Sequence, residues 1–299
     1  MKISGFSYIR NGIQVDYPFL EAIKSVLPIC DEFVVAVGDS TDGTREAVQN
    51  LDPVKMKIID TVWDMNNRKG GKIFAEQSNI ALDGVTGDWV IHIQADEVIH
   101  EDQLATLKEE ILKYDKDLRV EGLLFPYYHF WGDYRHIWTS RRVHRYEIRV
   151  FRNIKGIRSY KDSQGFRKYS SLEAYNKGEE GEKLRVKKSK VYLFHYKRVR
   201  SPKDMQKKMI LFKSFYHDDN WIENFKKKGE EYDYEVCDKL DEFNGTHPKL
   251  MQERISKLDW TFHYDKKKSN MKFRHKVLHF IEDITGYRLF EYKNYRLIK

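Results

Sequence analysis

Several features that mark other protein classes are scarce in this sequence. It has only two cysteines in 299 residues, Cys30 and Cys237, and their wide separation matches no metal-binding spacing. No stretch approaches the roughly 18 apolar residues that a membrane-spanning helix needs. The N-terminus has neither the apolar run nor the cleavage site of a signal peptide. We therefore expect reduced thiols and a cytoplasmic protein, with peripheral contact to the inner face of the membrane left open.

Positive charge and aromatic side chains are abundant instead. The formal net charge is +8, aromatic residues make up 14% of the chain, and basic residues concentrate after about position 135. This charge indicates an acidic partner, such as phosphates, an anionic lipid surface or a nucleic acid. A solvated face that only keeps the protein soluble would explain it equally well.

Strand and helix patterns alternate through the first 125 residues. Asp16 is expected to cap the first helix, with Pro18 in its first turn. The alternation predicts an α/β fold, with a mostly parallel sheet and helices on both faces. The expected strands are 3–9, 33–37, 57–59, 89–93 and 120–125, and the expected helices cover 19–27, 73–82 and 101–112.

The pattern changes from residue 127 onward. Residues 127–138 are aromatic and basic without clean periodicity. Residues 147–151 and 191–195 are typical of strands, whereas 160–169 and 177–183 are typical of loops. Ser201-Pro202 predicts the start of a helix, and lysine-rich helices are expected from there to the end.

Two strand ends carry polar turns that could bind a ligand. The first is Asp39-Ser40-Thr41-Asp42-Gly43-Thr44, whose carboxylates and backbone amides could contact a nucleobase or ribose. An ordinary turn that caps the next helix has the same composition. The second follows the apolar strand at 89–93 and contains Asp96 and Glu97. These carboxylates suit Mg²⁺ or Mn²⁺, although they would also suit a helix N-terminus.

Taken together, these motifs resemble glycosyltransferase family 2, whose members have the GT-A fold. The resemblance covers residues 1–125 well and extends more loosely to about 200. It rests on Arg10-Asn11, on 39–44, on Asn79 with Gly87-Asp88-Trp89, and on Gln94-Ala95-Asp96-Glu97. It implies a Rossmann-like GT-A domain over 1–200, with a nucleotide-sugar-binding half (1–125) and an acceptor-side half (126–200). A mainly helical, basic extension would follow over 201–299.

The resemblance implies a transferase that moves a sugar from a nucleoside-diphosphate sugar to a hydroxyl of a glycan or glycolipid, as in cell-envelope polysaccharide synthesis. An inverting reaction with Mn²⁺ or Mg²⁺ is implied as well. The donor would contact seven residues: Ile9, Arg10, Asp39, Lys72, Asn79, Gln94 and Asp96. Lys72 and Asn79 have structural alternatives, as a solvated lysine and as a link between a helix and a turn.

Two positions depart from the family pattern. The acidic pair after the second strand falls on Val37 and Gly38, with Asp39 one place later. The family's Asp-x-Asp metal motif begins with Gln94 and ends with Asp96. The resemblance therefore places the metal on Asp96, with help from Glu97 and from His195 at the end of a later strand.

An inverting transferase also needs a general base for the acceptor hydroxyl. The best candidate is Asp162 in a polar turn, and Glu147 is the second candidate. A turn residue without catalytic function would look the same as Asp162.

Two other functions remain open from the residues alone. A nucleotidyltransferase would use a similar sheet, but residues 5–12 match its glycine-rich phosphate loop poorly. A protein that binds single-stranded nucleic acid would use the basic, aromatic second half. The acidic turns would repel its phosphates, so we expect no nucleic acid partner. The lysine-rich tail, with Trp221, Trp260, Phe273 and Phe280, could instead rest on an anionic membrane.

Overall fold

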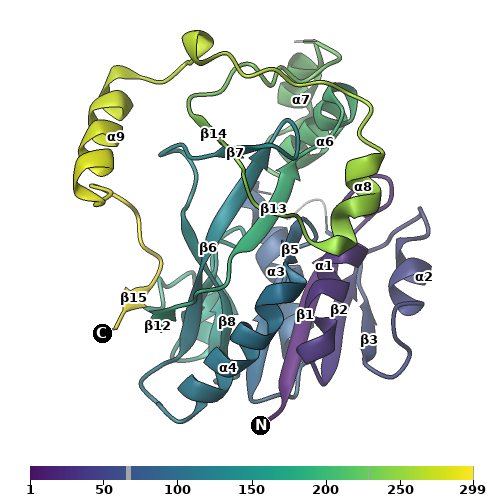
Figure 1. Ribbon diagram of the computed structural model, residues 1–299. Helices are drawn as coiled ribbons and strands as arrows, with labels where there is room; N and C mark the ends of the chain where they lie inside the picture. Colours follow the sequence, from purple (N-terminus) through teal and green to yellow (C-terminus); the bar gives the residue numbers. More distant parts are fainter. Residues whose placement is uncertain (65–68, 228, 299) are drawn as a thin grey trace.

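The computed structural model describes residues 1–64, 69–227 and 229–298. Its centre is a large sheet with the strand order β14-β7-β6-β8-β4-β1-β2-β3 (Figure 1). The strands on this path are β1 (Ile3–Ile9), β2 (Glu32–Val37), β3 (Met56–Asp60), β4 (Trp89–His92), β6 (Gly122–Trp131), β7 (His136–Trp138), β8 (Tyr146–Arg152) and β14 (Leu240–Glu242). Four more strands join it: β5 (Glu97–Ile99), β12 (Arg185–Lys188), β13 (Leu193–Arg198) and β15 (Arg296–Leu297).

The half of the sheet built from the first 92 residues is parallel. β1 pairs with β2 and β4, and β2 pairs with β3, all in the parallel sense. β8 then enters antiparallel between β4 and β6. β13 runs parallel to β6 and antiparallel to β5. This arrangement confirms the predicted α/β, GT-A-type fold.

Helices cover both faces of the sheet because the strands are apolar on both sides. Along β2, Phe33 and Val35 belong to one buried cluster and Val34 to the other, as the alternation of side chains in a strand requires. α1 and α4 pack on the first face, and α3 packs on the second. The helices are α1 (Phe19–Val26), α2 (Thr44–Gln49), α3 (Lys72–Asp83), α4 (Leu104–Asp115), α5 (Leu172–Asn176), α6 (Pro202–Ser214), α7 (Asp219–Lys226), α8 (Gln252–Ser256) and α9 (Phe273–Thr285).

The prediction that Asp16 caps the first helix is wrong. Pro18 occupies the cap position of α1, and Asp16 has a φ of 53°. The carboxylate of Asp16 instead accepts a hydrogen bond from Arg254 at 2.6 Å. The cap of α6 is confirmed, because the Ser201 hydroxyl accepts a hydrogen bond from the amide of Asp204.

The two loops predicted at 160–169 and 177–183 contain strands. A small separate sheet joins β9 (Ile157–Ser159), β10 (Phe166–Lys168) and β11 (Glu182–Lys183). β10 is hard to recognise in the sequence because it contains the charged Arg167. The side chain of Arg167 is nevertheless only 2% exposed. Its guanidinium lies 3.8 Å from the ring centre of Tyr160 and donates to Asn294 at 2.7 Å. The asparagine- and glycine-rich stretch 66–71 also predicts a loop, which lies partly outside the described residues.

Candidate active site

A cavity of about 300 Å³ opens at the carboxyl ends of β1 and β4. In open α/β sheets this edge is where ligands bind. The cavity walls come from the end of β1, the β4–β5 turn, β8, the turn after β9, β13 and α6. α6 lies in the part of the chain predicted as an extension, so the cavity draws on both predicted segments.

Seven of the eleven predicted site residues line this cavity. They are Ile9, Arg10, Gln94, Asp96, Glu147, Asp162 and His195. The other four are not part of its lining: Asp39, Lys72, Asn79 and Glu97. Seven predicted residues therefore share one cavity, although they come from segments far apart in the chain.

Asp96 lies between two basic side chains of the cavity. Its Oδ1 lies 3.4 Å from Nε2 of His195, and its Oδ2 lies 3.4 Å from Nζ of Lys208. Burial alone would raise the pKa of Asp96, but the Lys208 ammonium and His195 outweigh it, so that pKa is well below its ordinary value. Asp96 is therefore a carboxylate at neutral pH.

A chain of two imidazoles fixes the orientation of His195. Nε2 of His129 lies 2.8 Å from the carbonyl oxygen of His144, which can only accept, so this nitrogen carries the hydrogen. Burial lowers the pKa of His129 well below its usual value, so the ring is neutral and its Nδ1 accepts. Nδ1 of His195, at 2.7 Å, must then donate to it.

This hydrogen-bond order leaves Nε2 of His195 facing the carboxylate of Asp96, with a hydrogen when the ring is cationic and with a lone pair when it is neutral. Two electron-rich atoms 3.4 Å apart repel each other unless a proton or a cation lies between them. An imidazole and a carboxylate are ligands that Mn²⁺ accepts, and an outer hydrogen bond of this kind is common for metal-bound histidine. Asp96 and His195 therefore fit a divalent cation as a pair of ligands.

Glu97 has other partners. Its two carboxylate oxygens each accept a hydrogen bond of 2.8 Å from the guanidinium of Arg149, and the hydroxyl of Tyr127 donates to it as well. Burial raises the pKa of Glu97, but Arg149 outweighs this effect and brings it to about 2. This geometry favours a structural ion pair beneath the cavity over the predicted contact with a metal.

The clustering of possible metal ligands also argues against Glu97 as a ligand. Within residues 1–64, 69–227 and 229–298, the one group of three acidic or histidine side chains with clustered ligand atoms is His100, Glu101 and Asp102. None of these three lines the cavity. The predicted trio of Asp96, Glu97 and His195 does not come together as three ligands.

Lys197 and Lys208 also line the cavity, and Lys208 was missed by sequence reasoning. Lys208 of α6 is only 4% exposed, and its ammonium donates to the carbonyl oxygen of Lys197 at 2.9 Å. Burial lowers the pKa of both lysines, and the Arg200 charge lowers that of Lys208 further, whereas the Asp96 carboxylate opposes this shift and favours the ammonium form of each. Lys208 lies in a lysine-rich helix, so no local pattern distinguishes it from its solvated neighbours.

The two candidates for the general base both face the cavity. Burial raises the pKa of Glu147 to about 7. Asp162 accepts a hydrogen bond from the Tyr216 hydroxyl at 2.8 Å through Oδ2, whereas its buried Oδ1 has no hydrogen-bond partner among the residues that the structure describes. The turn that holds Asp162 is strained, because Lys161 and Ser163 on either side of it have positive φ values.

Glycine is required where this turn crosses β8. Gly165 has a φ of 92°, and a Cβ placed on it would stand 2.3 Å from Oε1 of Glu147. The turn that carries Asp162 therefore rests directly on the buried carboxyl group of Glu147.

The remaining predicted residues have structural contacts. The carboxylate of Asp39 lies 2.9 Å from the guanidinium of Arg10 and accepts a hydrogen bond from the backbone amide of Trp63 at 3.1 Å. It therefore orients Arg10, which lines the cavity. Asn79 links α3 to the amide of Ser159 and to Tyr175. Lys72 is exposed at the start of α3.

Comparisons with known proteins agree with this architecture. Residues 18–172 match the family model described as glycosyl transferase family 2. No curated protein matches the chain in sequence.

Three solved structures illustrate the similarity in fold. The mannosyltransferase PcManGT from Pyrobaculum calidifontis, in complex with GDP-Man and Mn²⁺, is 23% identical over 41% of this chain and 34% of its own, with a TM-score of 0.31. S. aureus TarS 1–349 in complex with UDP-GlcNAc is 15% identical over 75% of this chain and 70% of its own, with a TM-score of 0.38. A glucosyl-3-phosphoglycerate synthase from Mycobacterium tuberculosis, in complex with Mn²⁺, UDP and glucosyl-3-phosphoglycerate, is 17% identical over 44% of this chain and 45% of its own, with a TM-score of 0.29.

This chain thus spans about a third of the length of the Pyrobaculum protein, and these distant similarities concern the fold alone. The family model, by contrast, matches more than half of the 299 residues. The chain belongs to glycosyltransferase family 2.

Proposed function

We propose that this glycosyltransferase moves a sugar from a nucleoside-diphosphate sugar to a hydroxyl of a glycan or glycolipid, with Mn²⁺ or Mg²⁺ at Asp96 and His195. The observation that carries the proposal is the pair formed by Nε2 of His195 and Oδ1 of Asp96, which lie 3.4 Å apart and line the same cavity. Membership in the family favours this function over nucleotidyl transfer or nucleic-acid binding.

The charges of the cavity support the binding of a diphosphate. Arg10, Lys197 and Lys208 all line the same space as Asp96. A bound divalent cation would neutralise charge on the departing nucleoside diphosphate. The lysines would hold the same phosphates from the side of β13 and α6, and Arg10, oriented by Asp39, would contact the nucleotide at the end of β1.

Asp162 is the proposed general base of an inverting transfer. Its unpartnered Oδ1 would accept the proton of the acceptor hydroxyl. The hydroxyl oxygen forms a bond to the anomeric carbon of the sugar while the bond from that carbon to the diphosphate breaks. Tyr216 keeps the carboxylate in place through its contact with Oδ2.

A thermal-shift experiment tests the proposal. UDP, GDP, CDP and dTDP are each added with Mn²⁺, and the matching nucleotide should raise the melting temperature by about 5 °C at saturating concentration. Asp96→Ala and His195→Ala should lose the part of the shift that depends on Mn²⁺. Asp162→Asn should keep the whole shift, because the base acts on the acceptor and not on the donor.

Asp102→Ala is the matched control, since Asp102 is an exposed acid outside the cavity. It should behave as the unchanged protein. The absence of a shift with all four nucleotides would contradict the proposed function, and an equal loss in Asp102→Ala would contradict the assignment of the metal to Asp96.

A further inference from the structure

α9 carries a line of exposed apolar side chains on its outer face. Phe273, Val277, Phe280 and Ile284 follow one another at intervals of four, three and four residues, which places them on one side of the helix. Their exposed fractions are 81%, 42%, 67% and 68%. Aligned apolar side chains of this size on a surface mark an interaction site.

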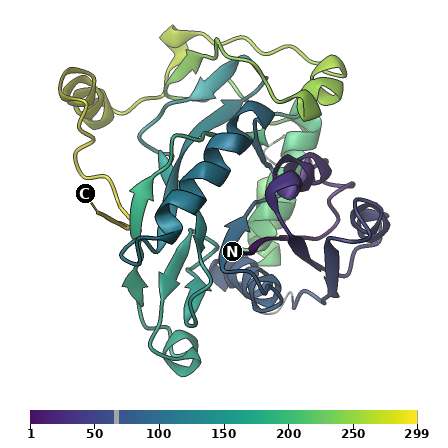
Figure 2. The same cartoon turned by 60° about the horizontal axis from the view of Figure 1, so that its bottom comes forward.

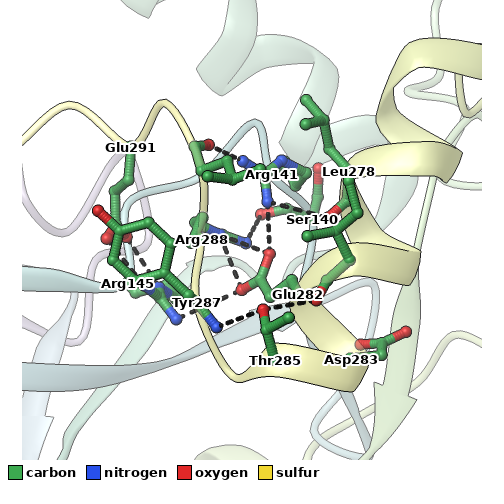
Figure 3. Close-up of polar contacts among 12 residues, drawn as sticks. Ser140, Arg141, Arg145, Leu278, Glu282, Asp283, Thr285, Tyr287, Arg288 and Glu291 are labelled. Carbon is green, nitrogen blue, oxygen red and sulfur yellow. Dashed lines mark hydrogen bonds and ion pairs between the residues drawn. The ribbon is translucent and has the colours of Figure 1, made fainter.

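The opposite face of α9 is fixed to the body of the protein. Glu282 accepts hydrogen bonds from Arg141 at 2.6 Å, from Arg288 at 3.0 Å and from Arg145 at 3.3 Å (Figure 3). His279, on the same side, is buried. The outward direction of the apolar face is therefore set by a network of charged hydrogen bonds on the inner face.

The segment after α9 continues the apolar surface. Tyr287, Phe290 and Tyr292 are 58%, 82% and 61% exposed. Phe290 has a φ of 58°, a conformation that bulky residues rarely adopt. The neighbouring Glu291 is held by Arg145 at 2.8 Å, so this stretch is fixed on its inner side as α9 is.

The charge beside the apolar line is positive. Lys272, Arg274 and Lys276 are exposed around the first turns of α9, and no carboxylate pairs with them in the part of the chain that the structure describes. The two acids of the helix are engaged elsewhere: Glu282 points inward, and Asp283 lies 3.6 Å from Lys239. A partner for this face must therefore combine an apolar layer with negative charge.

We propose that α9 and residues 287–292, here called the α9 face, dock on an anionic membrane surface. The apolar side chains would enter the interface between headgroups and acyl chains, and the basic residues would meet lipid phosphates. The helix lies at the edge of the molecule in both views, where a flat surface can reach it (Figures 1 and 2). The proposed contact is a peripheral one. No helix in residues 1–64, 69–227 or 229–298 is long and apolar enough to cross a bilayer.

The α9 face involves only part of the tail that the sequence suggested for membrane contact. Trp260 donates to the carbonyl oxygen of Gly132 at 2.7 Å and packs, partly buried, against a buried cluster. Trp221 stacks on His217 at 3.8 Å. Phe273 and Phe280 are the two predicted aromatic residues that belong to the exposed line.

Sedimentation with lipid vesicles tests this proposal on the full chain. The protein should sediment with vesicles of phosphatidylglycerol and phosphatidylcholine in equal parts, and much less with phosphatidylcholine alone. Phe273→Ser with Phe280→Ser should weaken this partition by about tenfold or more. Lys272→Glu with Lys276→Glu should weaken it by a similar factor, and high salt should do the same to the unchanged protein.

Val54→Ser with Leu118→Ser is the matched control, since these side chains are 90% and 78% exposed away from α9. It should bind vesicles as the unchanged protein does. Equal binding by the Phe273→Ser/Phe280→Ser variant would overturn the proposal. So would a dimer in solution that this variant abolishes, because the α9 face would then belong to a second copy. Nucleotide binding is measured separately, so failure of the proposed transferase function would leave this result intact.

Discussion

Glu147 and Asp96 line the same cavity and yet hold their protons very differently. Asp96 has Lys208 and His195 within 3.4 Å, which keep its pKa well below the ordinary value. Glu147 is buried against Gly165 and accepts a hydrogen bond from the amide of Ile148, and its pKa rises to about 7. The surroundings thus separate the pKa values of two carboxyl groups in one site. Near neutral pH Asp96 is charged, whereas Glu147 is close to losing its proton.

The raised pKa of Glu147 predicts a pH dependence of stability. The folded protein keeps this proton up to about pH 7, whereas the unfolded chain loses it near about pH 4.3. Between these values the folded state binds more protons, so the free energy of unfolding falls as the pH rises. Glu147→Gln resembles the protonated form, and at pH 8 it should be more stable than the unchanged protein by about 3 kcal/mol.

Urea unfolding at pH 4 and at pH 8 measures this effect. The two proteins should have similar midpoints at the lower pH and separate at the higher one. Glu109→Gln, at an exposed position of α4, is the control and should change neither value. Parallel pH profiles for Glu147→Gln and the unchanged protein would show that Glu147 ionises normally in the folded state.

At the scale of elements, the sequence predicted what local patterns encode. β1, β2, β4 and the start of α6 follow from apolar runs, caps and turns close to them in the chain. The position of Asp96 in the cavity has the same local origin, since an acid directly after a buried strand lies at the edge of the sheet. Lys208 reaches this edge from a helix more than a hundred positions later, and no local pattern encodes that contact.

β5 is an element that local sequence patterns do not encode. Residues 97–102 look like the acidic start of a helix, but Glu97 begins a strand and pairs with Arg149 from β8, 52 positions away. A buried carboxylate is acceptable only because this partner neutralises it. The strand could therefore not be recognised without knowing the topology that brings β8 next to β4.

The histidine chain between β6 and β13 gives a prediction at this scale. His129 of β6 sets which nitrogen of His195 carries the hydrogen, so it should control the affinity of the metal site without touching the metal. His129→Leu should weaken Mn²⁺ binding in the presence of nucleotide by about tenfold to a hundredfold. His129→Gln should recover part of the affinity, because an amide can still donate to the His144 carbonyl and accept from His195.

Titration followed by the electron spin resonance of free Mn²⁺ measures this affinity directly. His217→Leu is the control, since His217 stacks on Trp221 outside the cavity. The melting temperature without metal separates loss of affinity from loss of fold. Unchanged Mn²⁺ affinity in a folded His129→Leu protein would exclude the positioning role of His129.

For the whole molecule, the contacts argue against an independent C-terminal part. We predicted a boundary near residue 200, yet the Arg200 guanidinium donates to the carbonyl oxygens of Val15 and Asp16, beside the start of α1. β15 adds to β12 at the far side of the sheet, and Lys208 reaches Asp96 in the cavity. We propose that residues 1–200 and 201–299 are two segments of one cooperative unit.

This proposal predicts a single unfolding transition. Pulsed hydrogen exchange at increasing urea, measured by mass spectrometry of peptides, reports on residues 1–200 and on residues 201–299 separately, and the two urea midpoints should coincide. Arg254 of α8 donates to Asp16 at 2.6 Å and to Glu21 at 2.8 Å, which joins the two segments. Because its side chain is 27% exposed, Arg254→Ala should cost only about 1 to 2 kcal/mol. In one cooperative unit this loss must lower both midpoints together, whereas Arg119→Ala, at an exposed pair within one turn, should lower neither. A urea midpoint of residues 201–299 that falls below that of residues 1–200 in Arg254→Ala would mean that residues 201–299 unfold by themselves.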